Sequence, residues 1–184
     1  MSRNYKFHNP DGLYFVSFAV VYWLNIFVRE QYIEILLESL KFCQKEKGME
    51  IFAWCIMTNH VHIVFRTITD DKPEQVIGDL KRFTSKKIVT AIINNPNESK
   101  KEFFLNKFIE AGKKSSNVNK YQFWQHNNHP IEISDNKTMD IKINYVHNNP
   151  VKAGYVNIPE DYPYSSAKDY CGEKGLLPDI VVEH

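Results

Sequence analysis

The sequence contains few cysteines, and those present suggest no pairing. There are three, an odd number without the spacing of a metal site, which indicates neither a disulfide framework nor a zinc ribbon. The longest apolar run, residues 13–28, is interrupted by polar side chains and is too short for a comfortable membrane span. The first residues also lack the pattern of a secretory signal. We therefore expect a protein of the reducing cytoplasm with no membrane partner.

Neither sign of charge dominates the chain, whose net charge is +1 over 184 residues. The charges are nevertheless unevenly spread. Residues 72–152 hold 14 Lys and Arg against 8 Asp and Glu, whereas residues 153–184 hold 2 against 6. A basic middle segment can attract nucleic acid through its phosphates, but a solvated lysine-rich surface has the same composition. Charge alone leaves both interpretations open.

No internal repeat is present, and aromatic residues make up 14% of the chain. This composition is typical of a packed globular protein and excludes wholesale disorder. A length of 184 residues is too short for two independent cores. We therefore expect a single domain over residues 1–184, with residues 150–184 as a C-terminal tail packed on it.

Hydrophobic periodicity along the chain alternates between the strand pattern and the helix pattern. Strands are expected at residues 12–21, 51–57, 60–66, 121–125 and 130–133, and amphipathic helices at residues 28–47, 73–92 and 137–148. Residues 94–120 are largely polar and indicate an excursion with at least one helical turn, around the apolar side chains of Phe103, Phe104, Leu105 and Phe108. Pro150 is expected to end the last helix. This order predicts an α+β fold, a ferredoxin-like sandwich in which one antiparallel sheet has helices packed on one face. The other face would be free to bind a ligand.

The segment N-H-V-H-I-V-F, residues 59–65, contains two histidines on one face of an expected strand. Because side chains alternate along a strand, His60 and His62 project together, while the apolar residues between them face the helices. Two neutral imidazoles about 6–7 Å apart at their Cα atoms can bind one divalent metal ion. The pattern also fits two surface histidines on a half-buried strand, so this motif alone does not distinguish a metal site from an ordinary protein surface.

The last expected helix carries a tyrosine outside its apolar stripe. Met139, Ile143 and Val146 form that stripe at helical spacing, and Tyr145 lies about 120° from its centre. Asn149 follows one turn later on the same side. These two polar side chains could meet the two histidines. The alternative is a boundary tyrosine packed on the tail, with the asparagine ending the helix.

Three segments together resemble a known family. N-H-V-H-I-V-F is similar to the His-hydrophobic-His (HUH) motif of single-tyrosine transposases. Y-V-H-N-N-P-V-K-A-G-Y-V resembles the tyrosine helix of their REP-associated branch, the insertion-sequence-200-like proteins, and Y-P-Y-S-S in the tail resembles another signature of that branch. The pieces span about residues 51–166 in the family's order. The sequence departs from the family at Thr58, where proline is usual, and in the long excursion at residues 94–120.

The resemblance implies an enzyme that nicks and rejoins single-stranded DNA at hairpins or palindromes. His60, His62 and Asn149 would hold Mg²⁺ or Mn²⁺, and such hard cations suit a phosphate target. Tyr145 would attack phosphorus and form a 5′-phosphotyrosine link, which a second 3′-OH could resolve. The implied partner is therefore single-stranded or hairpin DNA.

Basic residues of the middle segment and of the last helix are candidate contacts to DNA phosphates. They are Lys81, Arg82, Lys86, Lys87, Lys142 and Lys152. Tyr121, Phe123 and Trp124 could either stack on unpaired bases or pack in the core. His126 and His129 are further candidates for the vicinity of the site, although a single histidine is more often structural or on the surface.

The main alternative is a domesticated relative that binds DNA hairpins without cutting them, but such a binder need not retain all four site residues. A metal hydrolase built on the two histidines is a second alternative, which lacks a convincing carboxylate base beside them. A plasmid-type replication initiator would share the histidine motif but not the tyrosine segment. The DNA target, the choice between monomer and homodimer, and whether Tyr145 serves its own or a partner's histidines stay open.

Overall fold

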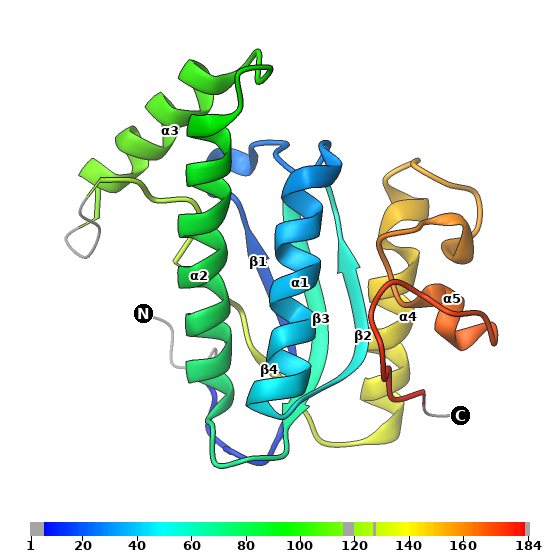
Figure 1. The fold of residues 1–184 in the computed structure, drawn as a ribbon. Helices are drawn as coiled ribbons and strands as arrows, with labels where there is room; N and C mark the ends of the chain where they lie inside the picture. The colour runs from blue at the N-terminus through cyan, green and yellow to red at the C-terminus, as the bar shows by residue number, and fades with distance from the viewer. Residues whose placement is uncertain (1–5, 116–119, 127, 183–184) are drawn as a thin grey trace.

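A four-stranded sheet forms the centre of the fold. In the computed structural model, which describes residues 6–115, 120–126 and 128–182, the strands pair in the order β2-β3-β1-β4, and all neighbours are antiparallel (Figure 1). The strands are β1 (Leu13–Ala19), β2 (Met49–Ile56), β3 (His60–Thr67) and β4 (Ile131–Ile133). This order is that of a ferredoxin-like sheet, and it confirms the predicted α+β fold with one antiparallel sheet.

Two long helices cover one face of this sheet. α1 (Glu30–Lys47) follows β1 and α2 (Pro73–Asn94) follows β3, and both lie in front of the sheet in Figure 1. Val61, Ile63 and Phe65 of β3 are fully buried in the same apolar cluster as the inner sides of these helices. Removal of this apolar surface from water holds the two layers together.

The polar excursion after α2 contains a complete helix, α3 (Lys101–Lys113), where the sequence indicated at least one turn. Phe104, Phe108 and Ala111 recur at helical spacing and are buried against the main core. The many polar residues between them form the solvent side of an amphipathic helix. No helix in the described part of the chain has the length and apolar character that a membrane span requires.

A further helix lies on the opposite face of the sheet, which the sequence predicted to be free. α4 (Asn136–Lys152) packs its apolar stripe of Met139, Ile143 and Val146 on Phe15, in a second buried cluster. The sheet thus has helices on both faces rather than on one. The reason is that the second face of β1, β2 and β3 is also apolar and must be shielded from water.

α4 continues past Pro150, which the sequence predicted to end the helix. A proline in the last turn removes one hydrogen bond, the one that its own N–H would make, and the residues after it can still close the helix through their N–H groups. Ala153 N–H donates to Asn149 O at 3.0 Å, and Tyr155 N–H donates to Pro150 O at 2.9 Å. Asn149 is therefore a helical residue, one turn beyond Tyr145 and on the same side of α4.

The segment after α4 covers the outer edge of β2. Ile56 N–H donates to Tyr164 O at 2.9 Å, and Ser166 N–H donates to Trp54 O at 3.0 Å. His147 of α4 joins this contact, since its Nε2 lies 2.8 Å from Ser166 Oγ. An open strand edge invites pairing with another chain. The tail therefore shields β2 and at the same time ties α4 to the sheet.

Residues 121–125 do not form a regular strand. One isolated bridge joins Trp124 to Val20, and the side chains of Phe123 and Trp124 are buried in the main core. Tyr121 is partly buried against the same core. The hypothesis that Phe123 and Trp124 stack on bases is therefore wrong, because neither ring is accessible.

Candidate functional site

The two histidines of β3 lie on the sheet face that α4 covers. Their ring centroids are 4.7 Å apart and their planes are nearly perpendicular, so both imidazoles border the same small volume. His62 is 3% exposed and stacks on Phe15 at a centroid distance of 5.7 Å, whereas His60 is partly exposed. Burial lowers the pKa of His62 to about 3, with the nearby His60 adding to the shift, and burial also lowers the pKa of His60. Both rings are therefore neutral near pH 7 and retain a lone pair for a ligand.

α4 places Tyr145 and Asn149 against the second histidine. The ring centroids of Tyr145 and His62 are 5.2 Å apart in an edge-to-face arrangement, and Asn149 Nδ2 lies 3.1 Å from His62 Nε2. Tyr145 is 40% exposed, and its ring also meets Phe15 edge to face at 5.7 Å. The fold thus brings His60, His62, Tyr145 and Asn149 together, although 87 residues separate His62 from Asn149.

Asn59 orients the first histidine. An amide oxygen can only accept, so the 2.6 Å hydrogen bond between Asn59 Oδ1 and His60 Nδ1 places the proton on Nδ1 and the lone pair on Nε2. The same side chain donates through Nδ2 to Trp23 O at 3.3 Å and to Asn25 Oδ1 at 3.0 Å. Outer hydrogen bonds of this kind fix the ring orientation of metal-binding histidines. In the sequence, Asn59 is only the first residue of the histidine motif, and no periodicity could have revealed this role.

Three neutral donors in this site fit a divalent cation. His62 Nδ1 is buried without a hydrogen-bond partner among the described residues, while its Nε2 faces Asn149. A half-turn of the Asn149 amide replaces Nδ2 with Oδ1, an oxygen of the kind that binds cations. Across the described ranges, no three His, Cys, Asp or Glu side chains gather into a metal-binding group. A cation held by His60, His62 and Asn149 would therefore keep its full positive charge for an anion such as phosphate.

Two of the six predicted basic residues lie beside this site. Lys142 Nζ is 4.9 Å from the ring centroid of Phe15, and Lys152 Nζ is 5.8 Å from that of Tyr145. Both lysines belong to α4, one before and one after the tyrosine. Their amines provide positive charge next to the tyrosine, where a phosphate would approach.

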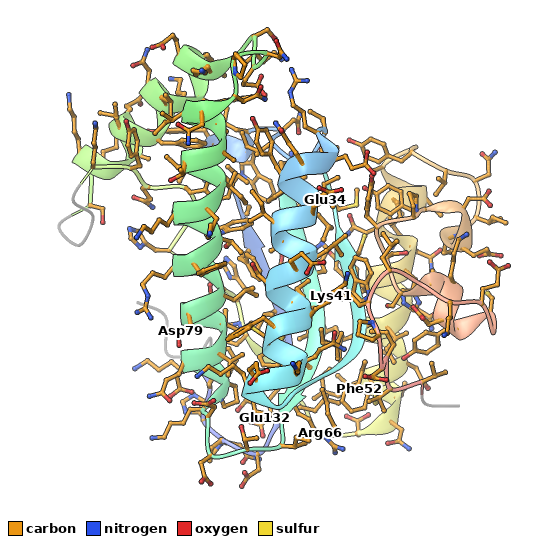
Figure 2. All side chains as sticks on the ribbon, viewed as in Figure 1. Glu34, Lys41, Phe52, Arg66, Asp79 and Glu132 are labelled. Atoms are coloured by element: carbon orange, nitrogen blue, oxygen red, sulfur yellow. The ribbon has the colours of Figure 1, made fainter. Side chains whose placement is uncertain are left out.

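Three other predicted basic residues lie elsewhere. Arg82, Lys86 and Lys87 are exposed on α2, in the helix layer on the opposite side of the sheet from α4. Arg82 pairs with Asp79 at 2.6 Å, and Figure 2 shows Asp79 on α2, with α1 between it and α4 in that view. The structure does not bring these three side chains to the histidines, so any contact they make with DNA would lie on a separate surface.

Lys81, the sixth, is not a free surface cation. Its Nζ donates to Gln125 O at 2.8 Å and to Asn128 Oδ1. Burial lowers the pKa of the Lys81 amine to about 8. Asn128 O in turn accepts a hydrogen bond of 2.9 Å from Ser17 N–H. Lys81 therefore ties α2 to Gln125 and Asn128, and Asn128 is in turn bonded to β1.

We expect Lys81→Met to destabilise the fold by about 1–3 kcal/mol, because two acceptors lose their donor. Lys86→Met, on the exposed side of the same helix, should change the free energy of unfolding by less than about 0.5 kcal/mol. Urea denaturation followed by circular dichroism measures both values. Equal stability of the two variants would show that the hydrogen bonds of Lys81 do not stabilise the fold.

Trp23 is a neighbour of the site that the sequence did not mark. Its ring centroid lies 5.6 Å from that of His60, edge to face, and the residue is 57% exposed. Its position depends on a left-handed backbone, with φ of 55°, which hydrophobic patterns do not reveal. Of the two further candidate histidines, His129 is exposed, and His126 has its Nε2 3.0 Å from Ser115 Oγ, next to the end of α3.

The chain is similar to known proteins in sequence and in fold. The sequence model of the family described as "Transposase IS200 like" matches residues 14–149. A Haemophilus influenzae protein described as a candidate REP-associated tyrosine transposase is 26% identical over 192 residues, which cover 100% of this chain and 98% of that protein. Among solved structures, a REP-associated tyrosine transposase bound to a REP hairpin has a TM-score of 0.65 at 19% identity, over 100% of this chain and 93% of that one. The last likeness shows a shared fold.

Proposed function

Because this chain belongs to the family of IS200-like transposases, we propose that it cuts and rejoins one DNA strand beside a hairpin, with Tyr145 as the nucleophile. The observation that supports this most directly is the contact between the tyrosine ring and His62, whose centroids are 5.2 Å apart. A side-chain hydroxyl beside a set of neutral cation ligands is an arrangement suited to phosphoryl transfer onto the protein.

We further infer that each copy of the protein uses its own tyrosine. Tyr145 and His62 of one chain are already in contact, so no exchange of α4 between copies is needed. α4 is held in this position by its buried stripe and by the contact of His147 with Ser166. These contacts support action within one chain over action on a partner's histidines.

The proposed reaction begins when the Tyr145 hydroxyl oxygen attacks the phosphorus of one phosphodiester. The new O–P bond forms as the bond from phosphorus to the 3′ oxygen breaks, and the phenolic proton ends on that 3′ oxygen. The products are a 5′-phosphotyrosine link and a free 3′-OH. Because the link is itself a phosphodiester, attack by a second 3′-OH rejoins the strand and returns the proton to Tyr145 without another co-reactant.

His60, His62 and Asn149 are proposed to hold a divalent cation, on which this family generally depends. When bound, the cation would polarise the scissile phosphate and stabilise charge on its oxygens. Mg²⁺ and Mn²⁺ are both candidates, and two imidazole nitrogens favour Mn²⁺, because Mg²⁺ demands oxygen ligands in near-ideal octahedral geometry. Lys142 and Lys152 would bind the neighbouring backbone phosphates.

The proposed substrate is single-stranded DNA that carries a hairpin. The solved relative is described as bound to a REP hairpin. An unpaired strand can turn its bases away and bring a backbone phosphate to Tyr145, whereas a continuous duplex cannot. We therefore expect hairpin single strands to bind more tightly than a long perfect duplex, with an affinity that falls steeply as salt rises.

The test uses single strands that contain hairpins from beside the protein's own gene, incubated with the protein and Mn²⁺ and separated on a denaturing gel. The strands are labelled at the 3′ end, because the fragment downstream of the cut should stay on the tyrosine. We expect a covalent protein–DNA band, and the matching perfect duplex is the control. Tight hairpin binding without an adduct would favour the non-cleaving binder, and absence of binding would reject both functions.

A further inference from the structure

The backbone that carries Trp23 is strained. Tyr22 and Trp23 both have φ of 55°, a left-handed conformation that residues other than glycine rarely adopt. Burial of the rings does not explain it, since these residues are 41% and 57% exposed. Hydrogen bonds hold the conformation, because Trp23 N–H donates to Val20 O at 3.0 Å and Asn59 Nδ2 donates to Trp23 O. Strain that presents aromatic rings to solvent at the border of a site is typical of a functional surface.

A hollow of about 450 Å³ begins at Trp23 and continues toward the end of α3. Trp23 and Tyr22 line it from the short 3₁₀ turn η1 (Val21–Trp23), and Lys114 and His126 line it from the other side. Its volume lies in the range of small-molecule pockets, about 300–1,000 Å³. Trp23 therefore borders both places, since its ring contacts His60 and it also lines the hollow.

The border of this hollow is positively charged. Lys107 Nζ and Lys114 Nζ each lie 5.3 Å from the ring centroid of Tyr22. Glu110 binds both amines and accepts a hydrogen bond of 2.9 Å from the Tyr22 hydroxyl. Two lysines against one glutamate leave one positive charge. Surfaces that bind single-stranded nucleic acid combine two features, exposed aromatic rings and positive charge, and both occur here.

We propose that Trp23 stacks on the unpaired base next to the phosphate that Tyr145 attacks, and that the hollow receives the strand beyond it, with Lys114 at a backbone phosphate. This inference rests on the proposed function and adds a positioning residue to it. Asn59 holds both His60 and the Trp23 carbonyl, so a base on the indole would be placed in register with the histidines. An unpaired strand is favoured over duplex, because a paired base offers no face to an indole.

The test is equilibrium binding of a fluorescent hairpin with a short single-stranded flank, followed by anisotropy in excess chelator so that no strand is cut. We expect Trp23→Ala to weaken binding of this DNA about 5- to 100-fold. Binding of the same hairpin with an abasic flank should not change, because no base is left to stack. Trp23→Phe keeps a ring and should restore most of the affinity. Phe42→Ala is the matched control, since Phe42 has the same 57% exposure but lies on α1.

Trp23→Gly separates stacking from backbone strain. Glycine tolerates the positive φ, so this variant should unfold at a temperature no lower than that of the unaltered protein, yet lose the same affinity for the flanked hairpin. Suppose that the unaltered protein forms the covalent adduct, but that Trp23→Ala binds the hairpin with the normal flank and the hairpin with the abasic flank as tightly as the unaltered protein does. The stacking role is then overturned, and the proposed function stands. If the unaltered protein neither binds nor cuts hairpin DNA, the proposed function fails and the stacking role fails with it.

Discussion

Tyr145→Phe is expected to abolish the covalent protein–DNA adduct and the free 3′-OH product together, by roughly 10³-fold or more. The substitution removes only the hydroxyl, while the ring keeps its edge-to-face contacts with His62 and Phe15. Since Tyr145 is 40% exposed, the free energy of unfolding should change little. Denaturing gels of 3′-labelled hairpin measure the adduct, and anisotropy should show hairpin binding near that of the unaltered protein.

Tyr155→Phe is the matched control for this experiment. Tyr155 is 51% exposed, and its hydroxyl lies 3.2 Å from Thr58 Oγ1, at the turn that leads into β3. We expect this variant to keep the adduct. Peptide mapping of the trapped adduct should place the DNA 5′-phosphate on Tyr145. An adduct that survives in Tyr145→Phe, or one that maps to Tyr155 or Tyr164, would mean that the tail supplies the nucleophile.

Loss of a residue that only orients a metal ligand costs roughly 10–100-fold in activity. His60→Ala and Asn149→Ala each remove a proposed ligand itself, so each is expected to reduce cleavage by more than this. Both residues are partly exposed, so both variants should fold. His62→Ala is a poorer test. His62 is 3% exposed and stacked on Phe15, so its removal should also cost about 1–3 kcal/mol of stability. The sequence predicted that the sheet face opposite the helices would be free, and for His62 on that face this prediction is wrong.

The same site should respond to the choice of cation. After dialysis against a chelator, cleavage should stop, and Mn²⁺ should restore it at a lower concentration than Mg²⁺. Asn59→Ala leaves the proposed ligands in place but frees the His60 ring, so it should raise the Mn²⁺ concentration needed by about 10–100-fold. Single-turnover cleavage across a metal titration measures these effects. Full cleavage in excess chelator would rule out a role for the cation.

The parts of the site that could be predicted from sequence depend on short-range geometry. Alternation along β3 placed His60 and His62 on one face, and their ring centroids are 4.7 Å apart. Helical spacing placed Tyr145 and Asn149 on one side of a helix, away from an apolar stripe that is buried in the structure. Each relation involves residues two to four positions apart, so the backbone period alone is sufficient.

The parts that could not be predicted depend on contacts between distant segments. The sequence indicated at least one helical turn in residues 94–120, but the full length of α3 depends on the packing of Phe104, Phe108 and Ala111 on the main core. Residues 121–125 contain a strand-like pattern, but the two aromatic side chains serve as core packing and only one bridge forms. Local propensity is a weak guide where burial in a remote core decides the outcome.

By itself, the sequence determined the strand and helix periods, and with them which side chains share a face. Only the tertiary structure decided how those faces meet. The second apolar face of the sheet needs a cover, and α4 provides it, which brings Asn149 within 3.1 Å of His62. The same packing sets Lys142 and Lys152 beside the site, while the partly buried Lys81 is held by hydrogen bonds on the opposite side of the sheet. Such distances arise from the burial of apolar surface between segments far apart in the chain, which no pattern within one segment encodes.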